Sequence, residues 1–206
     1  MTGIVEKIKG FLFSPSETFD ASKGDTLGDA FKYYIILLLI PALLSAVIAA
    51  VAFSLLAGFF GRMLPFMSAS LAFAGVGAAV VVFLYVLIAG AIGVLIGGLW
   101  LHIWVYLVGG RKGLTQTFKA LMYGATPSLL LGWIPVIGFL ASIWALIVEI
   151  IGIRQLHEIS TGKAVAAVIL AIILPLIVLL VILLPAMMPI TPHGHGIGGH
   201  YWHRFP

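Results

Sequence analysis

Residues 69–108 read ASLAFAGVGAAVVVFLYVLIAGAIGVLIGGLWLHIWVYLV, and this uncharged stretch decides how many times the chain crosses a membrane. As one straight helix it would be about 60 Å long, twice the hydrocarbon thickness of a bilayer at about 30 Å. It therefore predicts either one overlong helix or two short helices broken at glycines. The possible breaks are Gly90, Gly93, Gly97 and Gly98.

The rest of the chain is also apolar. Of its 206 residues, 62% are hydrophobic and 9% are charged, whereas a soluble domain carries about 45–50% apolar and about 25% charged residues. This composition excludes a water-soluble catalytic domain and predicts an integral membrane protein. Four further apolar segments are candidate spans, at residues 31–57, 114–131, 135–153 and 164–188.

Segment 114–131 is shorter than a normal span and is interrupted by Gly124 and Pro127. Short broken helices line substrate sites in transporters, but no second half of this chain repeats the interruption, which argues against an inverted-repeat transporter. Only residues 132–134 separate this segment from the next, which predicts a tight antiparallel hairpin.

The distribution of positive charge favours a single helix over residues 69–108. With five spans and a cytoplasmic N-terminus, nine of the 11 Lys and Arg residues lie inside, and only Arg62 and Arg204 lie outside. Two spans over the same stretch would place five inside and six outside, although cytoplasmic loops normally carry the excess of Lys and Arg. The predicted fold is therefore an all-α polytopic membrane helix bundle of five transmembrane helices, with the N-terminus inside and the C-terminus outside.

Three regions follow from this count. Residues 1–30 are expected to be a cytoplasmic amphipathic segment, residues 31–188 the transmembrane domain, and residues 189–206 an extracytoplasmic tail. Within the first region, residues 2–13 place apolar side chains on one helical face and charged side chains on the other, which predicts a short interfacial helix. Residues 14–17 (SPSE) have the pattern of a capping box with proline at the first helical position, and predict a second helix that ends near Ala21.

His102 and Glu149 are ionisable residues within the predicted spans, where a charge is costly and is a functional hypothesis by default. Counted as helical rise from Arg111 and Arg154, His102 lies about 13 Å and Glu149 about 8 Å from the inner boundary. At these depths a Glu–His pair can relay protons, bind a divalent cation or organise a cytoplasm-facing pocket. The competing interpretation is that Glu149 reaches the headgroups or caps a helix, and that His102 bonds a backbone carbonyl.

The tail is rich in histidine, a weak signal for binding of Ni²⁺, Cu²⁺ or Zn²⁺. The histidines are His193, His195, His200 and His203. A flexible tail has no further partners to orient these imidazoles, so adventitious binding or no binding is the competing interpretation. No other cofactor is predicted, and the lack of cysteine excludes thiolate metal sites and thiol catalysis.

Small residues recur at a spacing of four along two segments, as Gly93 and Gly97 and as Gly138 and Ser142. Such faces let helices approach closely, whether within one chain or between two copies. Both interpretations stay open at this point.

Three stretches of the chain, in the order in which they occur, are similar to a known family of membrane proteins. They are FLFSPSETF at residues 11–19, YLVGGRKGLTQTFKALMYGATPSLL at 106–130, and IPVIGFLASIWALIVEIIGIRQLHEISTGKAVAAVIL at 134–170, followed by a last apolar helix. Together they resemble the Yip family of Ypt-interacting membrane proteins over roughly residues 10–185. The most specific parts are the Gly109–Gly110 turn with Tyr123 and Pro127 after it, and the stretch GIRQLH at residues 152–157.

The resemblance implies a five-helix bundle with a cytoplasmic N-terminus, in agreement with the count from charges. Eukaryotic members bind prenylated Rab-type GTPases and associate with one another in vesicle trafficking, whereas no established activity is implied for prokaryotic members. This chain has about thirty residues before its first span, in place of the long N-terminal domain common in the eukaryotic proteins. That difference argues against GTPase binding. In its short N-terminal segment the chain resembles a prokaryotic member of the family, and this resemblance implies that the protein lies in the cell membrane.

Two functions are compatible with these features. The first is a non-enzymatic scaffold or adaptor that assembles with itself or with other membrane proteins in the bilayer; the second is a small ion, proton or metal transporter or channel that uses His102 and Glu149. No nucleophile–base pair predicts an enzyme, and no basic run with a soluble module predicts nucleic-acid binding. The cytoplasmic face of interest, where basic groups also attract anionic headgroups, comprises Gly109, Gly110, Arg111, Lys112, Arg154 and His157.

Overall fold

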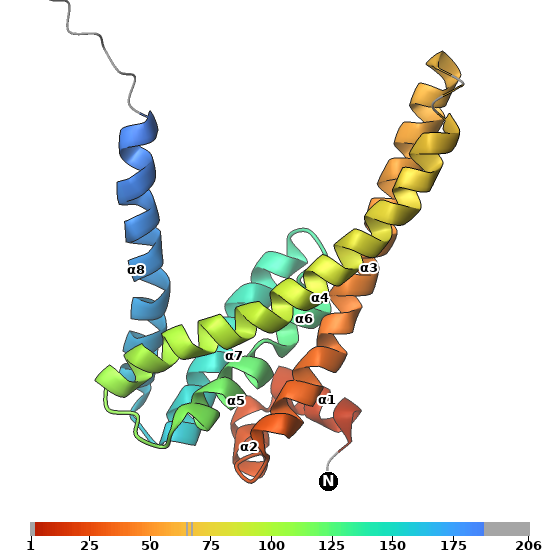
Figure 1. Cartoon of the computed structure of the whole chain (residues 1–206). Helices are drawn as coiled ribbons and strands as arrows, with labels where there is room; N and C mark the ends of the chain where they lie inside the picture. Colours follow the sequence, from red (N-terminus) through yellow and green to blue (C-terminus); the bar gives the residue numbers. More distant parts are fainter. Residues whose placement is uncertain (1–2, 65, 67, 188–206) are drawn as a thin grey trace, which may run out of the picture. The chain divides into compact units, whose positions relative to one another are not determined.

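The computed structural model describes residues 3–64, 66 and 68–187, and helices make up almost all of them (Figure 1). In chain order the helices are α1 (Ile4–Phe13), α2 (Pro15–Ala21), α3 (Leu27–Met63), α4 (Ser68–Leu107), α5 (Leu114–Gly124), α6 (Thr126–Leu131), α7 (Ile137–His157) and α8 (Thr161–Met187). No strand occurs within the described ranges, so the predicted all-α class is confirmed. The chain divides into two units, Met1–Ala171 and Ile172–Pro206, and α8 begins in the first and continues into the second.

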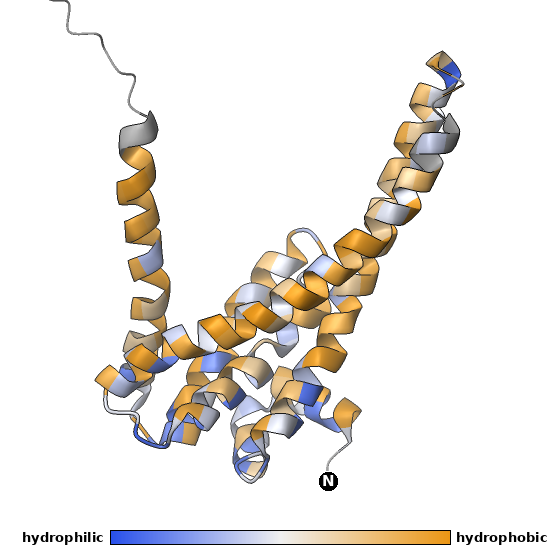
Figure 2. Ribbon diagram, in the orientation of Figure 1, coloured by the Kyte–Doolittle hydropathy of each residue, from blue (hydrophilic) through white to orange (hydrophobic). Residues whose placement is uncertain are grey.

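Four helices of the described chain are long and apolar enough to cross a membrane, namely α3, α4, α7 and α8. Residues 69–108 lie almost entirely in the single 40-residue helix α4, as the charge distribution predicts. Helices α3 and α4 lie side by side as an antiparallel pair (Figure 1). Apolar residues dominate α3, α4 and α8 (Figure 2), and many of their large side chains are exposed, as expected for surfaces covered by lipid tails.

The segment at residues 114–131 does not form one spanning helix, because it breaks at Ala125 into α5 and α6. Pro127 lacks the backbone N–H that would bond the carbonyl of Tyr123 in a continuous helix. The Thr126 hydroxyl donates to that carbonyl instead, at 2.6 Å. The described residues therefore contain four candidate spans, and the predicted fifth span falls on two short helices.

Helix α5 lies at the centre of the first unit, against α3, α4 and α7. Its residues from Thr117 to Gly124 are buried except for the half-buried Leu121. Helix α1 is amphipathic as predicted, but its apolar face packs on protein as well: Phe11 is fully buried, and Trp144 Nε1 of α7 donates to the Leu12 carbonyl at 3.0 Å. Helix α1 therefore packs on the protein core, which the prediction of an interfacial helix did not include.

The starts of α2 and α3 differ in their caps. The side-chain cap predicted at Ser14 does not form; instead the Thr18 hydroxyl donates to the Ser14 carbonyl at 2.8 Å, while Pro15 occupies the first turn as predicted. A capping box forms at the start of α3, where the Thr26 hydroxyl accepts from the Asp29 N–H at 3.2 Å and the Asp29 carboxylate accepts from the Thr26 N–H at 3.0 Å.

Candidate functional site

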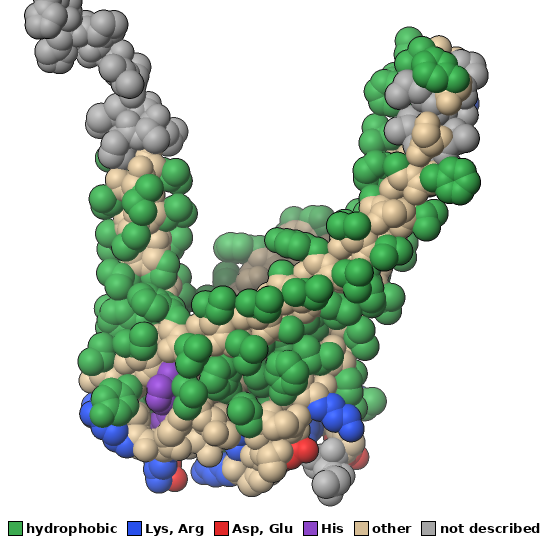
Figure 3. Space-filling model, in the orientation of Figure 1, with side chains coloured by type: hydrophobic (Ala, Val, Ile, Leu, Met, Phe, Trp, Pro, Cys, Tyr) green, Lys and Arg blue, Asp and Glu red, His purple; other side chains and the backbone are tan. Residues whose placement is uncertain are grey.

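Charged side chains gather at one end of the first unit, around α1, α2 and the turns that follow α4 and α7 (Figure 3). Folding brings together there α1, the connection between α2 and α3, and α5, which are far apart in sequence. Two polar clusters lie in this region, the N-terminal network (Lys7, Asp25 and Tyr123) and the histidine chain (His102, Thr117 and His157).

The N-terminal network ties α1 to α5 through the α2–α3 connection. Lys7 Nζ lies 2.5 Å from Asp25 Oδ2, and the Tyr123 hydroxyl donates to the same oxygen at 2.6 Å. Lys7 also donates to the Tyr123 hydroxyl at 3.3 Å. The Lys7 and Asp25 side chains are 14% and 22% exposed, so the three groups hold one another in a mostly buried arrangement.

The network favours the ionised form of the Asp25 carboxyl. Partial burial by itself raises the pKa of this carboxyl, but hydrogen bonds from Lys7 and Tyr123 and the charges of Lys7 and Lys119 outweigh burial and lower the pKa below its ordinary value of 3.8. A depressed carboxyl pKa stabilises the folded state above the pKa of the unfolded chain. This stabilisation is lost as the pH falls through the lower pKa of the folded state.

We therefore expect the docking of α1 to weaken in acid. Between about pH 7 and about pH 3, amides of residues 4–13 should lose protection against hydrogen exchange, after correction for intrinsic rates. Asp25→Asn should show weaker protection at neutral pH and a smaller change with pH. Asp20→Asn is the control, because Asp20 forms an exposed pair with Lys23 at 2.7 Å. Equal pH dependence in Asp25→Asn and the unmodified chain would contradict the assignment.

Lys119 extends the network from α5. Its side chain is completely buried, and its Nζ donates to the carbonyl of Lys23 at 2.8 Å, just after α2. A buried cation is costly unless it is hydrogen-bonded, so Lys119 fixes the position of the chain that follows α2.

Aromatic rings pack against the network. Phe11 stacks on Tyr123 with 4.7 Å between ring centroids and meets Phe19 edge to face at 4.8 Å. Tyr33 of α3 meets Tyr123 at 5.2 Å. Phe19 fits against α7 because residue 152 is glycine, where a Cβ would lie 2.5 Å from Phe19 Cζ. Helices α1 and α2 are therefore part of the core that α5 organises.

The histidine chain joins α4, α5 and α7. Thr117 Oγ1 lies 2.7 Å from His102 Nδ1 and 3.0 Å from His157 Nε2, so the hydroxyl bridges the two imidazoles. Thr117 and His157 are buried, and His102 is half-buried. Because a threonine hydroxyl donates one hydrogen bond and accepts others, it couples the tautomers of the two rings.

Glu149 is not part of the histidine chain. Within the described part of the protein, no hydrogen bond or ion pair joins its carboxylate to His102. The backbone of Glu149 packs against α5, where a Cβ on Gly124 would lie 2.9 Å from Glu149 Cα. The structure brings His102 together with Thr117 and His157, and does not bring it together with Glu149.

The turn between α4 and α5 carries most of the predicted cytoplasmic face. Gly109 has a φ of +104°, a conformation that favours glycine. Arg111 lies over the Tyr106 ring at 3.6 Å, and Lys112 pairs with Glu158 at 2.5 Å. Both cations are exposed, yet each has a partner that restrains it.

Three other residues of the predicted face are less accessible. Arg154 is half-buried, and Gly110 and His157 are buried. A Cβ on Gly110 would lie 3.0 Å from His157 Nδ1, an atom that has no hydrogen-bond partner among the described residues. His157 therefore lies in the interior, behind the turn, rather than on its surface.

The predicted tail metal site, at His193, His195, His200 and His203, lies outside the described residues. Within the described ranges, no group of three or more His, Cys, Asp or Glu residues is arranged to hold a metal ion. The histidine chain supplies two imidazoles, fewer than the three or four ligands of a zinc site.

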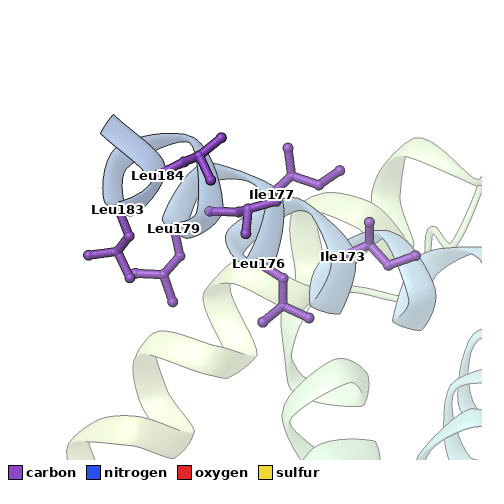
Figure 4. A pocket seen from close by; sticks show the side chains of 7 residues that line it. Ile173, Leu176, Ile177, Leu179, Leu183 and Leu184 are labelled. Atoms are coloured by element: carbon purple, nitrogen blue, oxygen red, sulfur yellow. The ribbon is translucent and has the colours of Figure 1, made fainter. Parts of the chain in front are cut away.

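An apolar hollow of about 450 Å³ lies along the C-terminal half of α8 (Figure 4). Seven side chains between Ile173 and Leu184 line it, and all of them belong to this one helix. Gaps between branched side chains on one face of an apolar helix are filled by lipid tails in a bilayer, so this hollow does not indicate a ligand site.

Sequence reasoning selected His102 and His157 but not the Thr117 that joins them, and it did not select the N-terminal network. Lys119 carried a usable signal, because it is a charged residue within an apolar segment, as His102 and Glu149 are. Lys7 and Asp25 carried none, since they are ordinary charged residues of a polar N-terminal segment and meet only after folding.

A comparison with protein-family models finds a match to the Yip1 domain over residues 9–183. The match spans α2 to α7 completely and includes the histidine chain, Asp25 and Tyr123, whereas Lys7 precedes it. Neither the search of curated proteins nor the search of solved structures gives a significant match.

Proposed function

Because the chain belongs to the Yip1 domain family, we propose that it is a non-enzymatic scaffold or adaptor that assembles with itself or with other membrane proteins. Family membership and the four long apolar helices make it an integral membrane protein. The scaffold role rests on one further observation, the outward position of a glycine in the most apolar part of α4.

The glycines of α4 differ in what surrounds them. A Cβ on Gly90 would lie 2.7 Å from Leu38, and a Cβ on Gly98 would overlap the Phe118 ring, so these two glycines permit packing within the chain. A Cβ on Gly93 would meet nothing within 4 Å. The exposed side chains of Ile92 and Ile96 flank it. A small residue on an exposed apolar helix lets a second helix approach closely, which supports assembly in the membrane.

We expect Gly93→Leu to reduce assembly. In nanodiscs or mild detergent, native mass spectrometry of the unmodified chain should detect a discrete complex, and the substitution should shift it toward the monomer by about tenfold in affinity, because the added side chain separates the helices by removing close contacts worth about 1–2 kcal/mol. Gly77→Leu is the matched control: Gly77 is also open, and at 100° per residue it lies about 160° around α4 from Gly93. A monomeric unmodified chain without partners, or equal effects of both substitutions, would contradict the proposal.

We also propose that α5 and α6 cross the bilayer together as a fifth, broken span. With five crossings, nine of the 11 Lys and Arg residues lie on the inner side, which is the distribution that cytoplasmic loops normally show. A broken helix is tolerated in a membrane where protein surrounds it, and α3, α4 and α7 pack around α5. In this arrangement the N-terminus is cytoplasmic and the C-terminus is outside, and in a prokaryote the membrane is the cell membrane.

The basic turn between α4 and α5 is the proposed contact surface on the cytoplasmic side. Arg111 and Lys112 are exposed there. Arg154 is half-buried, and it lies shortly before Glu158, the residue that pairs with Lys112. Basic groups at a membrane surface attract anionic headgroups and acidic segments of partner proteins, with each Lys or Arg contributing about 1 kcal/mol near an anionic surface. Gly109 and Gly110 shape the turn that presents these cations.

Transport of ions or protons is the second candidate function, and the histidine chain is the observation that favours it. A hydroxyl between two imidazoles is an arrangement that passes protons, and ionisable groups inside a membrane mark such paths. Vesicles containing the purified chain separate the two functions. Transport predicts proton or metal flux above that of protein-free vesicles, and a scaffold predicts none.

A further inference from the structure

A hollow of about 430 Å³ opens beside the N-terminal network. Its walls come from α1, the end of α2, the α2–α3 connection and the first turns of α3. Two lysines and two aspartates line it, so positive and negative charges are present in equal number. These residues are Lys7, Asp25, Asp29 and Lys32.

The charged groups of the hollow have unused bonding capacity. Both hydrogen bonds of the Asp25 carboxylate fall on Oδ2, and so do both of the side-chain bonds of Asp29. Among the described residues, each Oδ1 is therefore left without a hydrogen bond. The Lys32 ammonium likewise has no hydrogen bond or ion pair within the described part of the chain, and its side chain is exposed. One cation and two carboxylate oxygens are thus available to a ligand.

The hollow changes from polar to apolar along α3. Asp29, Lys32, Tyr33 and Ile36 recur at the spacing that places residues on one helical face, and all four line the hollow. From Asp29 to Ile36 the helix rises about 10 Å. The polar layer on each side of a bilayer is about 5–8 Å thick, so this distance spans the change from headgroups to hydrocarbon.

The position of α3 places this change at the membrane boundary. Lys32 is the last charged residue before a run that stays uncharged until Arg62. The hydrocarbon core therefore begins just beyond Lys32, and the charged end of the hollow lies at the headgroup level. Ile4 and Ala21 add apolar surface to its wall from the N-terminal helices.

We propose that this hollow binds the headgroup of a zwitterionic phospholipid that carries a primary ammonium, the phosphoethanolamine class. The lipid phosphate accepts from the Lys32 ammonium group, and the lipid ammonium donates to the free oxygens of Asp25 and Asp29. The start of an acyl chain lies against Ile36. The site thereby ties a lipid to the surface where α1 docks on α3 and α5.

The pairing of charges sets the selectivity. An anionic headgroup brings no cation to the free oxygens of the two carboxylates, so it loses the attraction that a lipid ammonium gains there. A choline headgroup has no N–H to donate, so it loses the hydrogen bonds to the carboxylates. A free phosphate would leave the apolar part of the hollow uncovered. A lipid with phosphate and primary ammonium satisfies all three features.

Lipid binding to the full-length chain tests the proposal. The chain is purified in detergent, stripped of lipid, and mixed with phosphatidylethanolamine, phosphatidylcholine or phosphatidylglycerol of the same acyl chains, and native mass spectrometry measures the bound fraction. We expect the ethanolamine lipid to bind most strongly. Lys32→Gln should weaken its binding about fivefold, the effect expected for one lysine at a membrane surface.

Two further variants make the result specific. Lys9→Gln removes an exposed lysine of α1 that does not line the hollow, and should leave binding unchanged. Ala21→Leu fills the hollow without changing its charge and should weaken binding of the ethanolamine lipid. Equal or stronger binding of phosphatidylglycerol would overturn the proposal in favour of a general basic surface. Equal effects of Lys32→Gln and Lys9→Gln, or unchanged binding in Ala21→Leu, would also overturn it.

Discussion

Phe11→Ala is expected to lower the free energy of unfolding by about 3–5 kcal/mol, the usual cost of removing a buried phenyl ring. Phe11 is completely buried although it lies on a short helix near the N-terminus. Its ring stacks on Tyr123 and packs edge to face against Phe19 and Tyr33. Removing it leaves a cavity at the point where α1, α2, α3 and α5 meet.

The substitution should also release α1 from the core. Denaturant or thermal unfolding in detergent measures the loss of stability, and hydrogen exchange over residues 4–13 measures the release. Phe13→Ala is the matched control, because Phe13 lies on the same helix and is 81% exposed. Similar losses from both substitutions, or full protection of α1 in Phe11→Ala, would show that the aromatic cluster does not hold the N-terminal helices.

Gly124→Ala is expected to destabilise the chain by about 1–3 kcal/mol, because it overpacks the crossing of α5 and α7. A Cβ at this position would lie 2.9 Å from Glu149 Cα and 3.1 Å from Glu149 N. These are backbone atoms, so the contact is relieved only if the two helices move apart. The movement would also disturb the histidine chain, which spans the same two helices through Thr117 and His157.

The sign of this effect is informative, because alanine is otherwise the better helix former by about 1 kcal/mol. Gly58→Ala supplies the control: Gly58 lies inside α3, and a Cβ there would meet nothing within 4 Å. We expect this control to be neutral or stabilising. Unfolding midpoints of both variants in one detergent decide the comparison, and a stabilised Gly124→Ala chain would contradict the close approach of α5 and α7.

Much of the helical architecture was predictable because it depends on local patterns. The uncharged stretch at residues 69–108 forms one helix, and the distribution of Lys and Arg was sufficient to favour that outcome over two spans. The interruption at Gly124 and Pro127 was visible in the sequence, and it marks where α5 ends and α6 begins. The way Thr126 satisfies the freed carbonyl depends on a side-chain conformation that no periodicity reveals.

The polar clusters were predictable only in part. An ionisable residue in an apolar segment stands out, so His102 and Glu149 were both selected, yet the depth of two residues does not determine which helices are neighbours. Helix α5 lies between them in the fold, and it supplies Thr117 to His102 while its Gly124 packs on the backbone of Glu149. The expected pairing of His102 with Glu149 therefore gave way to the histidine chain.

The sequence by itself determined the environment, the all-α class and the approximate positions of the long apolar helices, because hydrophobicity, helical periodicity and charge bias act over neighbouring residues. Tertiary structure alone decided that the N-terminal helices enter the core through Phe11 and Phe19, and that Lys7, Asp25 and Tyr123 meet. These contacts join residues separated by up to 116 positions. Their formation depends on shape complementarity, such as the space left by Gly152 for Phe19, and that complementarity exists only once the helices are packed.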